Sequence, residues 1–216
     1  MNRIIITVLA LALSSSTLSQ SNIRTLWLTM PDSLLPYMNQ NMRKDHLDFY
    51  DMKVRSEVRN ILEGSCVMDS LSADYLSINM NQNLRIQLKV LTPSVGTDTL
   101  LCMIKTFLAP ECESEVAFFN TTWHRKSDSY GLPLEHEADS LIDHFICQPE
   151  TLPTNSYAEL REKIDFIMLS AQWDTTADAL ILTASVPMLN KEEVDKFRPL
   201  ILQRKFKWIG NKFKEC

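Results

Sequence analysis

The chain has 216 residues, of which 45% are hydrophobic and 23% are charged, and its formal net charge is −5. An acidic chain offers no general basic surface for the phosphates of a nucleic acid, so no nucleic acid is expected among its partners. Beyond the N-terminal segment, no apolar run approaches the ~20 residues that span a bilayer, so no transmembrane segment is expected in the mature chain.

The N-terminal segment, residues 1–19, has the three parts of a cleavable signal peptide. Arg3 gives a positive start, residues 4–13 form an apolar run interrupted only by Thr7, and small polar residues follow. This run is too short to serve as a permanent membrane anchor, for which about 20 residues are needed. We therefore expect an exported protein, periplasmic or on the outer surface, that is cleaved near Ser19/Gln20.

The mature chain is expected to open with a helix over Pro31–Met42. Apolar residues recur there at helical spacing, and a proline is tolerated in the first turn of a helix. The charge-dense stretch 43–51 is expected to end this helix. The next stretch, residues 54–62, suits a strand or a helix equally.

Alternation of apolar and polar residues then predicts strands. Residues 76–80 and 84–90 alternate around an Asn-Gln-Asn turn, which predicts a hairpin with one buried and one wet face. The almost continuously apolar stretch 99–108 predicts a central strand covered on both faces, and another strand is expected over 115–123. A long connection with weak periodicity follows over 127–153.

The C-terminal part returns to strands, expected over 164–173, 179–186 and 200–208, with a short helix from Asn190. Lysines on one face of the last strand are typical of an exposed or edge strand.

Together these elements predict an α+β fold, in which a large, mainly antiparallel sheet carries the N-terminal helix on one face. Residues 20–216 are expected to form a single domain, either as one unit or as two β-rich halves. These halves, 20–126 and 154–216, would be joined by the long connection.

Five cysteines are present, and in an oxidising compartment an even number of them can pair. Cys102 lies in the apolar strand, where it suits a small core residue. Alternatively, Cys102 and Cys112 flank a hairpin connection and could form a disulfide across it. No C-x-x-C pair exists, so neither a zinc knuckle nor a redox dithiol is indicated.

The segment 135–144 is the best candidate for a metal site. If it is helical, His136 and Asp139 share one face with Asp143, and His144 follows directly, so that these side chains could bind a divalent cation. The alternative is a solvated acidic connection with no ligand.

Two other groupings of polar residues are weaker candidates. Asp45-His46, with Asp48 and Asp51, resembles the start of an acid–base site but lies among aromatics, as at a packed helix end. Residues 123–126, Trp-His-Arg-Lys, could receive an acidic ligand or form a polar strand end. The four glycines are isolated and no G-x-S-x-G or H-E-x-x-H motif occurs, so no cofactor is predicted.

Several short motifs, taken in order, resemble a family of secreted Bacteroidetes proteins known only as a domain of unknown function. The motifs are Met30–Pro36, Arg43 with Asp45, Leu47–Tyr50, Tyr75-Leu76, Leu88–Leu91, Thr106, Ser114 and the region of Trp123. The resemblance implies an exported bacterial protein and assigns no catalytic residue.

The absence of catalytic motifs favours a non-enzymatic binding or scaffolding module, whose partner is an unknown protein or a small apolar ligand. Two alternatives stay open. One is a metal-dependent hydrolase that uses the 135–144 segment, and the other is a periplasmic carrier whose curved sheet encloses an apolar cavity.

Overall fold

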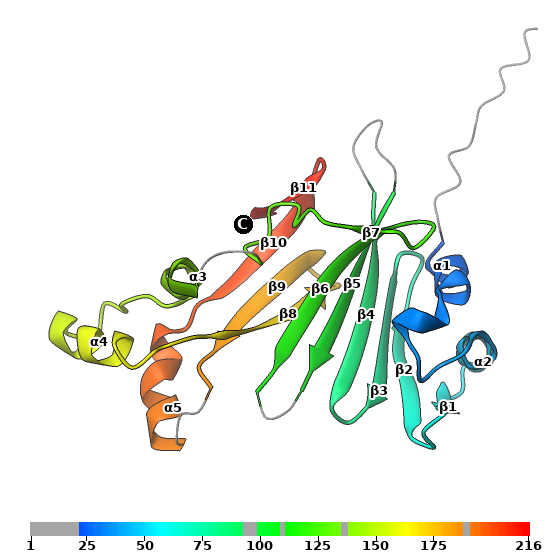
Figure 1. Cartoon of the computed structure of the whole chain (residues 1–216), viewed down its shortest axis with the longest axis horizontal. Helices are drawn as coiled ribbons and strands as arrows, with labels where there is room; N and C mark the ends of the chain where they lie inside the picture. The colour runs from blue at the N-terminus through cyan, green and yellow to red at the C-terminus, as the bar shows by residue number, and fades with distance from the viewer. Residues whose placement is uncertain (1–21, 93–98, 109–110, 135–137, 188–190) are drawn as a thin grey trace, which may run out of the picture.

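The computed structural model describes residues 22–92, 99–108, 111–134, 138–187 and 191–216, so the expected signal peptide lies outside the described residues. The fold is α+β with two antiparallel sheets (Figure 1), which confirms the predicted fold class. No described helix is long and apolar enough to cross a membrane.

The two sheets are each built from strands that follow one another in the sequence. The first sheet has seven strands in chain order: β1 (Glu57–Arg59), β2 (Ser65–Leu71), β3 (Tyr75–Asn81), β4 (Leu84–Leu91), β5 (Leu100–Phe107), β6 (Glu113–Asn120) and β7 (Arg125–Lys126). The second sheet has four, in the order β11 (Lys212–Glu215), β10 (Gln203–Ile209), β9 (Ala179–Ser185) and β8 (Met168–Asp174). The described helices are α1 (Ile23–Thr29), η1 (Asp32–Leu34), α2 (Gln40–Asp51), α3 (Ala138–Phe145), α4 (Thr154–Arg161), α5 (Lys191–Phe197) and η2 (Arg198–Leu200).

The hairpin β3–β4 and the central strand β5 confirm two predicted strand positions, but the expected wet face of the hairpin is wrong over most of its length, where Ser77, Gln87 and Lys89 are buried. β3 and β4 pair with Ile78 opposite Ile86, and the register shifts next to the turn, between Asn79 and Asn81. Side chains alternate between the two faces of such a pleated sheet. In β5, Leu101 belongs to the core on one face and Cys102 to the core on the other, so this strand is covered on both sides.

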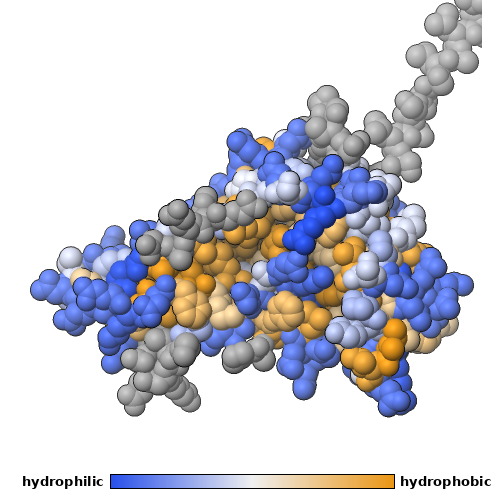
Figure 2. Space-filling model, viewed as in Figure 1, coloured by the Kyte–Doolittle hydropathy of each residue, from blue (hydrophilic) through white to orange (hydrophobic). Residues whose placement is uncertain are grey.

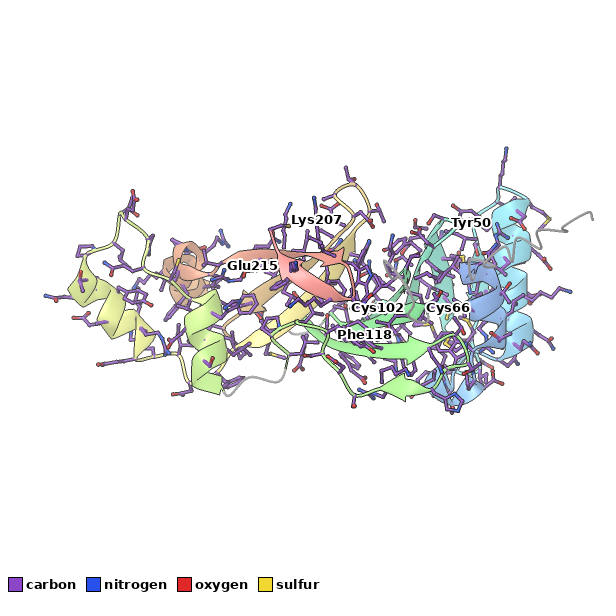
Figure 3. The ribbon with its side chains drawn as sticks, turned by 90° about the horizontal axis from the view of Figure 1, so that it is seen from above. Tyr50, Cys66, Cys102, Phe118, Lys207 and Glu215 are labelled. Carbon is purple, nitrogen blue, oxygen red and sulfur yellow. The ribbon has the colours of Figure 1, made fainter. Side chains whose placement is uncertain are left out.

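Helices α1 and α2 cover one face of the first sheet, as Figures 1 and 3 show. In α1, Ile23, Leu26 and Trp27 are buried at helical spacing, and Asn22 caps the helix by accepting from the N–H of Arg24. The sequence did not predict this helix. An N-terminal helical layer on one face of the sheet is therefore confirmed, but it is built from two helices.

The predicted helix over Pro31–Met42 is wrong in position. The chain forms the short η1 and a turn there, and α2 begins only at Gln40, with Asn39 accepting from the N–H of Met42 at 3.0 Å. Proline disfavours the helical conformation in the residue before it, and Leu35, before Pro36, has φ −136° and ψ 72°. The apolar side chains of this segment reach the core from irregular backbone.

Buried Arg43 holds that irregular segment in place. Only 1% of this residue is exposed, and its guanidinium donates to the carbonyls of Met38 (2.8 Å) and Met30 (2.7 Å) and to Asp32 Oδ1 (2.8 Å). Charge-assisted hydrogen bonds of this kind satisfy carbonyls that no helix pairs. The motifs around residues 30–36 and Arg43, which carried the family resemblance, therefore serve packing.

The second sheet packs against the other face of the first sheet, over β4, β5 and β6. The edge of β8 is closed by side chains of the first sheet. The Ala171 N–H donates to Ser114 Oγ (2.8 Å), Thr106 Oγ1 donates to the Ala171 carbonyl (3.3 Å), and the Trp173 N–H donates to Gln87 Oε1 (3.3 Å). Pairing these backbone groups protects an edge that could otherwise recruit another strand.

The helices α3, α4 and α5 gather at the end of the molecule farthest from α1 and α2 (Figure 1). They surround a third, smaller core that includes Ile142, Ile164 and Phe197. The connection expected over 127–153 thus contains α3, and α4 begins directly after it.

Candidate functional site

The predicted metal ligands are not assembled into a site by the described residues. His136 lies outside them, and only the backbone of Asp139, in α3, is described. Asp143 forms an ion pair with Arg161 at 2.8 Å, and His144 Nε2 lies 3.7 Å from a carboxylate of β11. Over the described ranges, no three His, Cys, Asp or Glu side chains are grouped closely enough to hold a metal ion.

The structure does not bring Cys102 and Cys112 together. Cys102 pairs with Phe118 in the β5–β6 register, whereas Cys112 precedes Phe118 by six residues. At about 3.3 Å per residue, six extended residues span about 20 Å, whereas a disulfide needs Cα atoms within about 7 Å. Both are free thiols, and burial raises the pKa of the Cys102 thiol.

The Asp45-His46 pair is split by α2, which turns Asp45 to solvent and buries His46 completely. His46 Nδ1 lies 2.8 Å from Ser56 Oγ, and that hydroxyl donates to the His46 carbonyl at 2.9 Å. The hydroxyl proton is used there, so Nδ1 carries the hydrogen of a neutral ring. Desolvation lowers the pKa of His46 to about 4. His46 therefore has a structural role in the core, and Asp45 has no part in it.

The candidate residues 123–126 likewise include a buried residue, Trp123, and exposed ones. Trp123 is buried against Phe119, with ring centroids 5.6 Å apart, and has a positive φ of 64° in the turn before β7. Arg125 is exposed and pairs with Glu115 at 3.2 Å. This grouping is a strand end whose aromatic residue belongs to the core.

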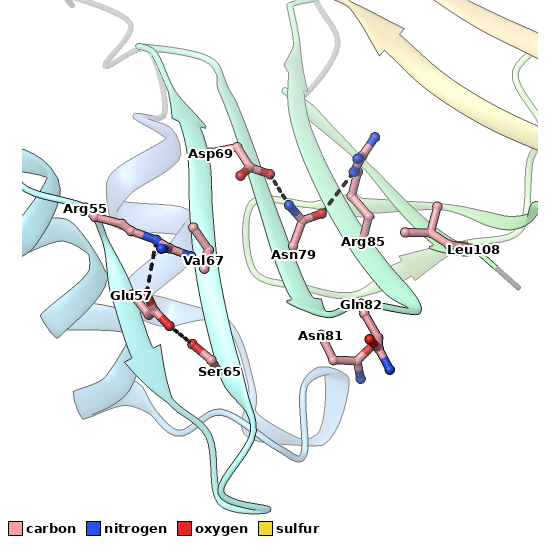
Figure 4. Close-up of a pocket in the computed structure, with 10 residues that line it drawn as sticks. All are labelled: Arg55, Glu57, Ser65, Val67, Asp69, Asn79, Asn81, Gln82, Arg85 and Leu108. Carbon is pink, nitrogen blue, oxygen red and sulfur yellow. Dashed lines mark hydrogen bonds and ion pairs between the residues drawn. The ribbon is translucent and has the colours of Figure 1, made fainter.

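A polar groove lies where the second sheet leaves the first sheet uncovered. It occupies about 470 Å³ and is lined mainly by residues of β1 to β4, as Figure 4 shows. On its β1–β2 side, Arg55 pairs with Glu57 at 3.0 Å, and Ser65 donates to the same carboxylate. Val67 and Leu108 are the apolar residues of the lining. We call this feature the polar groove.

A chain of side-chain hydrogen bonds orients Arg85 in the polar groove (Figure 4). Asn79 donates to Asp69 Oδ2 at 2.6 Å and accepts from Arg85 Nε at 3.1 Å. Desolvation raises the pKa of Asp69, and the positive charge of Arg85 opposes this shift. The two terminal guanidinium nitrogens of Arg85 have no hydrogen-bond partner among the described residues, so they remain open to a ligand.

A smaller recess of about 150 Å³ continues the polar groove beneath the second sheet, sharing Arg85 and Leu108 with it. Thr106, Ser170 and Gln172 contribute polar groups to the recess. Within the described part of the chain, Arg85 is the one charged residue of the lining, which includes no carboxylate. The recess is therefore suited to a small anionic group.

The β8–β9 turn beside this region is fixed by Lys89, which is only 8% exposed. Its ammonium lies 2.7 Å from Asp74, 2.8 Å from Asp178 and 5.2 Å from the ring centre of Trp173. Burial alone would lower the pKa of Lys89, but the hydrogen bonds to the two aspartates raise it. A cation paired in this way holds the second sheet in place over β4.

Sequence reasoning missed the polar groove, although one signal was present. The hairpin was expected to have a wet face, and Asn79 and Arg85 do lie on it. Gln87 and Lys89, on the same face, are buried because the second sheet covers them. The position of the second sheet alone decides which residues of this face line the polar groove and which are buried in the interior.

Comparison with known proteins identifies a family and a solved structure of similar fold. The family model described as "Protein of unknown function (DUF3256)" matches residues 15–213. A solved structure of a domain of an uncharacterized protein from Porphyromonas gingivalis W83 is similar with a TM-score of 0.69 at 17% identity. The similarity covers 90% of this chain and 98% of that one. No curated protein matches the chain.

The sequence resembled a Bacteroidetes family known only as a domain of unknown function. These findings agree in part: the family model has no assigned function, and a Bacteroidetes protein has a similar fold.

Proposed function

The chain belongs to the DUF3256 family, and for this member we propose a non-enzymatic binding function, in which the polar groove holds an extended peptide that carries a carboxylate. The observation that carries the proposal is the guanidinium of Arg85, which Asn79 orients at the mouth of the recess. Its two terminal nitrogens have no partner among the described residues, and none of these residues brings a carboxylate into the recess.

The composition of the polar groove supports a hydrogen-bonding ligand. Pockets for small apolar molecules are lined mostly by hydrophobic and aromatic side chains. In the polar groove, donors and acceptors such as Arg55, Glu57 and Asn81 outnumber the apolar residues, and the described lining includes no aromatic residue. A peptide supplies matching N–H and C=O groups at regular intervals, so its backbone can use this lining.

The recess supports a carboxylate as the anchoring group of that peptide. The guanidinium fork matches two carboxylate oxygens, and such charge-assisted pairs are stronger than neutral hydrogen bonds. Because Asn79 already accepts from Nε, the guanidinium is held in one orientation before the ligand arrives. Preorganisation of this kind lowers the entropy cost of binding.

The test is a comparison of two short peptides by amide chemical-shift perturbation in NMR. Acetylated tetra-alanine with a free C-terminal carboxylate is expected to shift residues around Arg85. The same peptide with an amidated C-terminus should bind roughly tenfold more weakly, since a hydrogen bond to a charged group contributes about 1.5–3 kcal/mol. Equal binding of both peptides, or no shifts in the polar groove, would contradict the proposal.

A matched pair of variants locates the effect. Arg85→Gln should remove the preference for the carboxylate. Arg198→Gln removes the same charge from an exposed residue, whose partner is Asp195 at 3.4 Å in the α5–η2 region, and should keep the preference. If Arg198→Gln reduces it equally, the effect comes from net charge.

Export to the periplasm or the outer surface is part of the proposal and is supported by the N-terminal sequence pattern. Cell fractionation and N-terminal sequencing should find the protein outside the cytoplasm and beginning at Gln20. Cytoplasmic protein that retains Met1 would refute this part alone.

A second cleft, apolar on one side and charged on the other, favours a ligand with an apolar chain and an acidic head, such as a fatty acid, as a second candidate. Figure 2 shows apolar side chains gathered on one face of the molecule. A cleft of about 330 Å³ has Val116, Phe118 and Leu134 on its apolar side, and its polar side includes Arg125, Lys126 and Asp128. Saturable quenching of tryptophan fluorescence by a fatty acid, unaffected by Arg85→Gln, would favour this carrier function. No response would exclude it.

A further inference from the structure

The hairpin β10–β11 presents four lysines on its outer face. Phe206 and Phe213 of this hairpin are buried against the first sheet, so the residues that alternate with them point outward. The outward residues include Lys205, Lys207, Lys212 and Lys214, all of them exposed. We call this surface the lysine face.

The lysine face places like charges next to one another. Lys207 and Lys214 are directly opposite in the β10–β11 register. Like charges at directly opposite positions destabilise a sheet. Figure 3 labels Lys207 and Glu215 on this hairpin. Glu215 forms an ion pair with Arg204 on the inner side of the hairpin, so its charge does not neutralise the lysines.

Few carboxylates compensate these charges. No ion pair joins Lys207, Lys212 or Lys214 to a described carboxylate. Asp174 lies near the other end of the face, where backbone hydrogen bonds lower its pKa and the charge of Lys205 lowers it further. The lysine face is thus a concentrated positive surface on a chain whose net charge is −5.

The turn of the hairpin adds an exposed apolar residue to these charges. Ile209 is 48% exposed, pairs with Lys212 and precedes Gly210, whose φ is +72°. In Figure 1 this turn projects at the upper edge of the molecule. Interfacial helices combine apolar residues that enter the bilayer with lysines that meet anionic headgroups, and Ile209 with its flanking lysines offers the same combination on a smaller scale.

We propose that the lysine face docks the protein on an anionic phospholipid surface, with Ile209 entering the interface between headgroups. Each lysine close to such a surface strengthens binding about fivefold, and the lysines of this face act together. Ile209 favours a lipid surface over a nucleic acid, because a bilayer has an apolar layer beneath its headgroups and the phosphates of a nucleic acid do not. The lysine face also bears no aromatic side chain for stacking on bases, since Trp208 points inward.

Vesicle co-sedimentation tests this proposal, using the chain from Gln20, which contains every described residue but lacks the apolar N-terminal run. The protein should sediment with vesicles of phosphatidylcholine and phosphatidylglycerol, and less at high salt because the attraction is screened. It should not sediment with phosphatidylcholine alone. Equal binding to both vesicles, no binding to either, or tighter binding to duplex DNA would overturn the proposal.

Two double variants separate the lysine face from net charge. Lys207→Gln with Lys214→Gln should weaken vesicle binding about 25-fold, from two factors of about five. Lys163→Gln with Lys196→Gln removes two exposed lysines outside this face and should weaken it far less. Equal losses in both would refute a defined docking surface. The first variant should fold at least as stably as the parent, because it removes a like-charge pair.

Discussion

Acidification should destabilise this protein through one buried histidine. His46 is fully buried in α2, with its Nδ1 hydrogen directed to Ser56, and its Nε2 has no hydrogen-bond partner among the described residues. A proton on Nε2 would place a charge among apolar side chains of the core, and this desolvation lowers the pKa of His46 to about 4.

The direction and size of the effect follow from linkage. The unfolded chain takes up the proton near the ordinary pKa of 6.5, whereas the folded chain does so only near pH 4. The contribution of neutral His46 to the free energy of unfolding is therefore fully present above pH 6.5 and is lost as the pH falls toward 4. Between pH 7.5 and 4.5 the free energy of unfolding should decrease by about 2.5 kcal/mol.

The pH range in which His46 lowers the stability lies above the range in which the carboxylates with lowered pKa values do so. Asp51 and Asp174 have lowered pKa values, so their contributions are lost only as the pH falls below the ordinary aspartate value of 3.8. A loss of stability that begins near pH 6.5 is therefore assigned to a histidine.

Urea denaturation at a series of pH values from 7.5 to 4.5 measures the effect, with the wild type compared with two variants. His46→Asn keeps a donor toward Ser56 without a titrating ring and should flatten the dependence. His124→Gln changes an exposed histidine and should keep it. An NMR titration of the wild type gives an independent check if the first variant does not fold. An imidazole pKa near 6.5 for His46, or an equal slope in His46→Asn, would refute the reasoning.

Three further predictions concern stability and are checked by the same urea denaturation at neutral pH. Asn39→Ala should lower the free energy of unfolding by about 1 kcal/mol, since it removes the cap of α2. Lys89→Met should lower it by about 1 kcal/mol, because Asp74 and Asp178 lose a shared partner but stay accessible to water, and an unchanged value would contradict the role of Lys89 in holding the sheets together. Gly131→Ala should be costlier than Gly210→Ala. Both glycines have positive φ, but a Cβ at Gly131 would lie 2.9 Å from a backbone oxygen of Phe213, whereas the space around Gly210 is open.

Much of the fold was determined by local sequence patterns. Alternation over 76–90 indicated the β3–β4 hairpin, and the apolar run over 99–108 indicated a strand covered on both faces. These predictions succeeded because side-chain alternation is a property of each strand by itself. The N-terminal helical layer was predicted with the wrong bounds, since Leu35 and Met38 have helical spacing but reach the core from a loop held by Arg43.

Only the tertiary structure decided where a ligand can bind. Asn79, Arg85, Gln87 and Lys89 lie on the same face of one hairpin, and sequence patterns give all four the same wet environment. The second sheet, more than eighty residues away in the chain at Trp173, covers Gln87 and Lys89 and leaves Asn79 and Arg85 beside open space. Burial of that kind depends on contacts between distant segments, which no local periodicity records. The sequence by itself therefore determined which residues share a face, and the packing of the two sheets determined which of them form the polar groove.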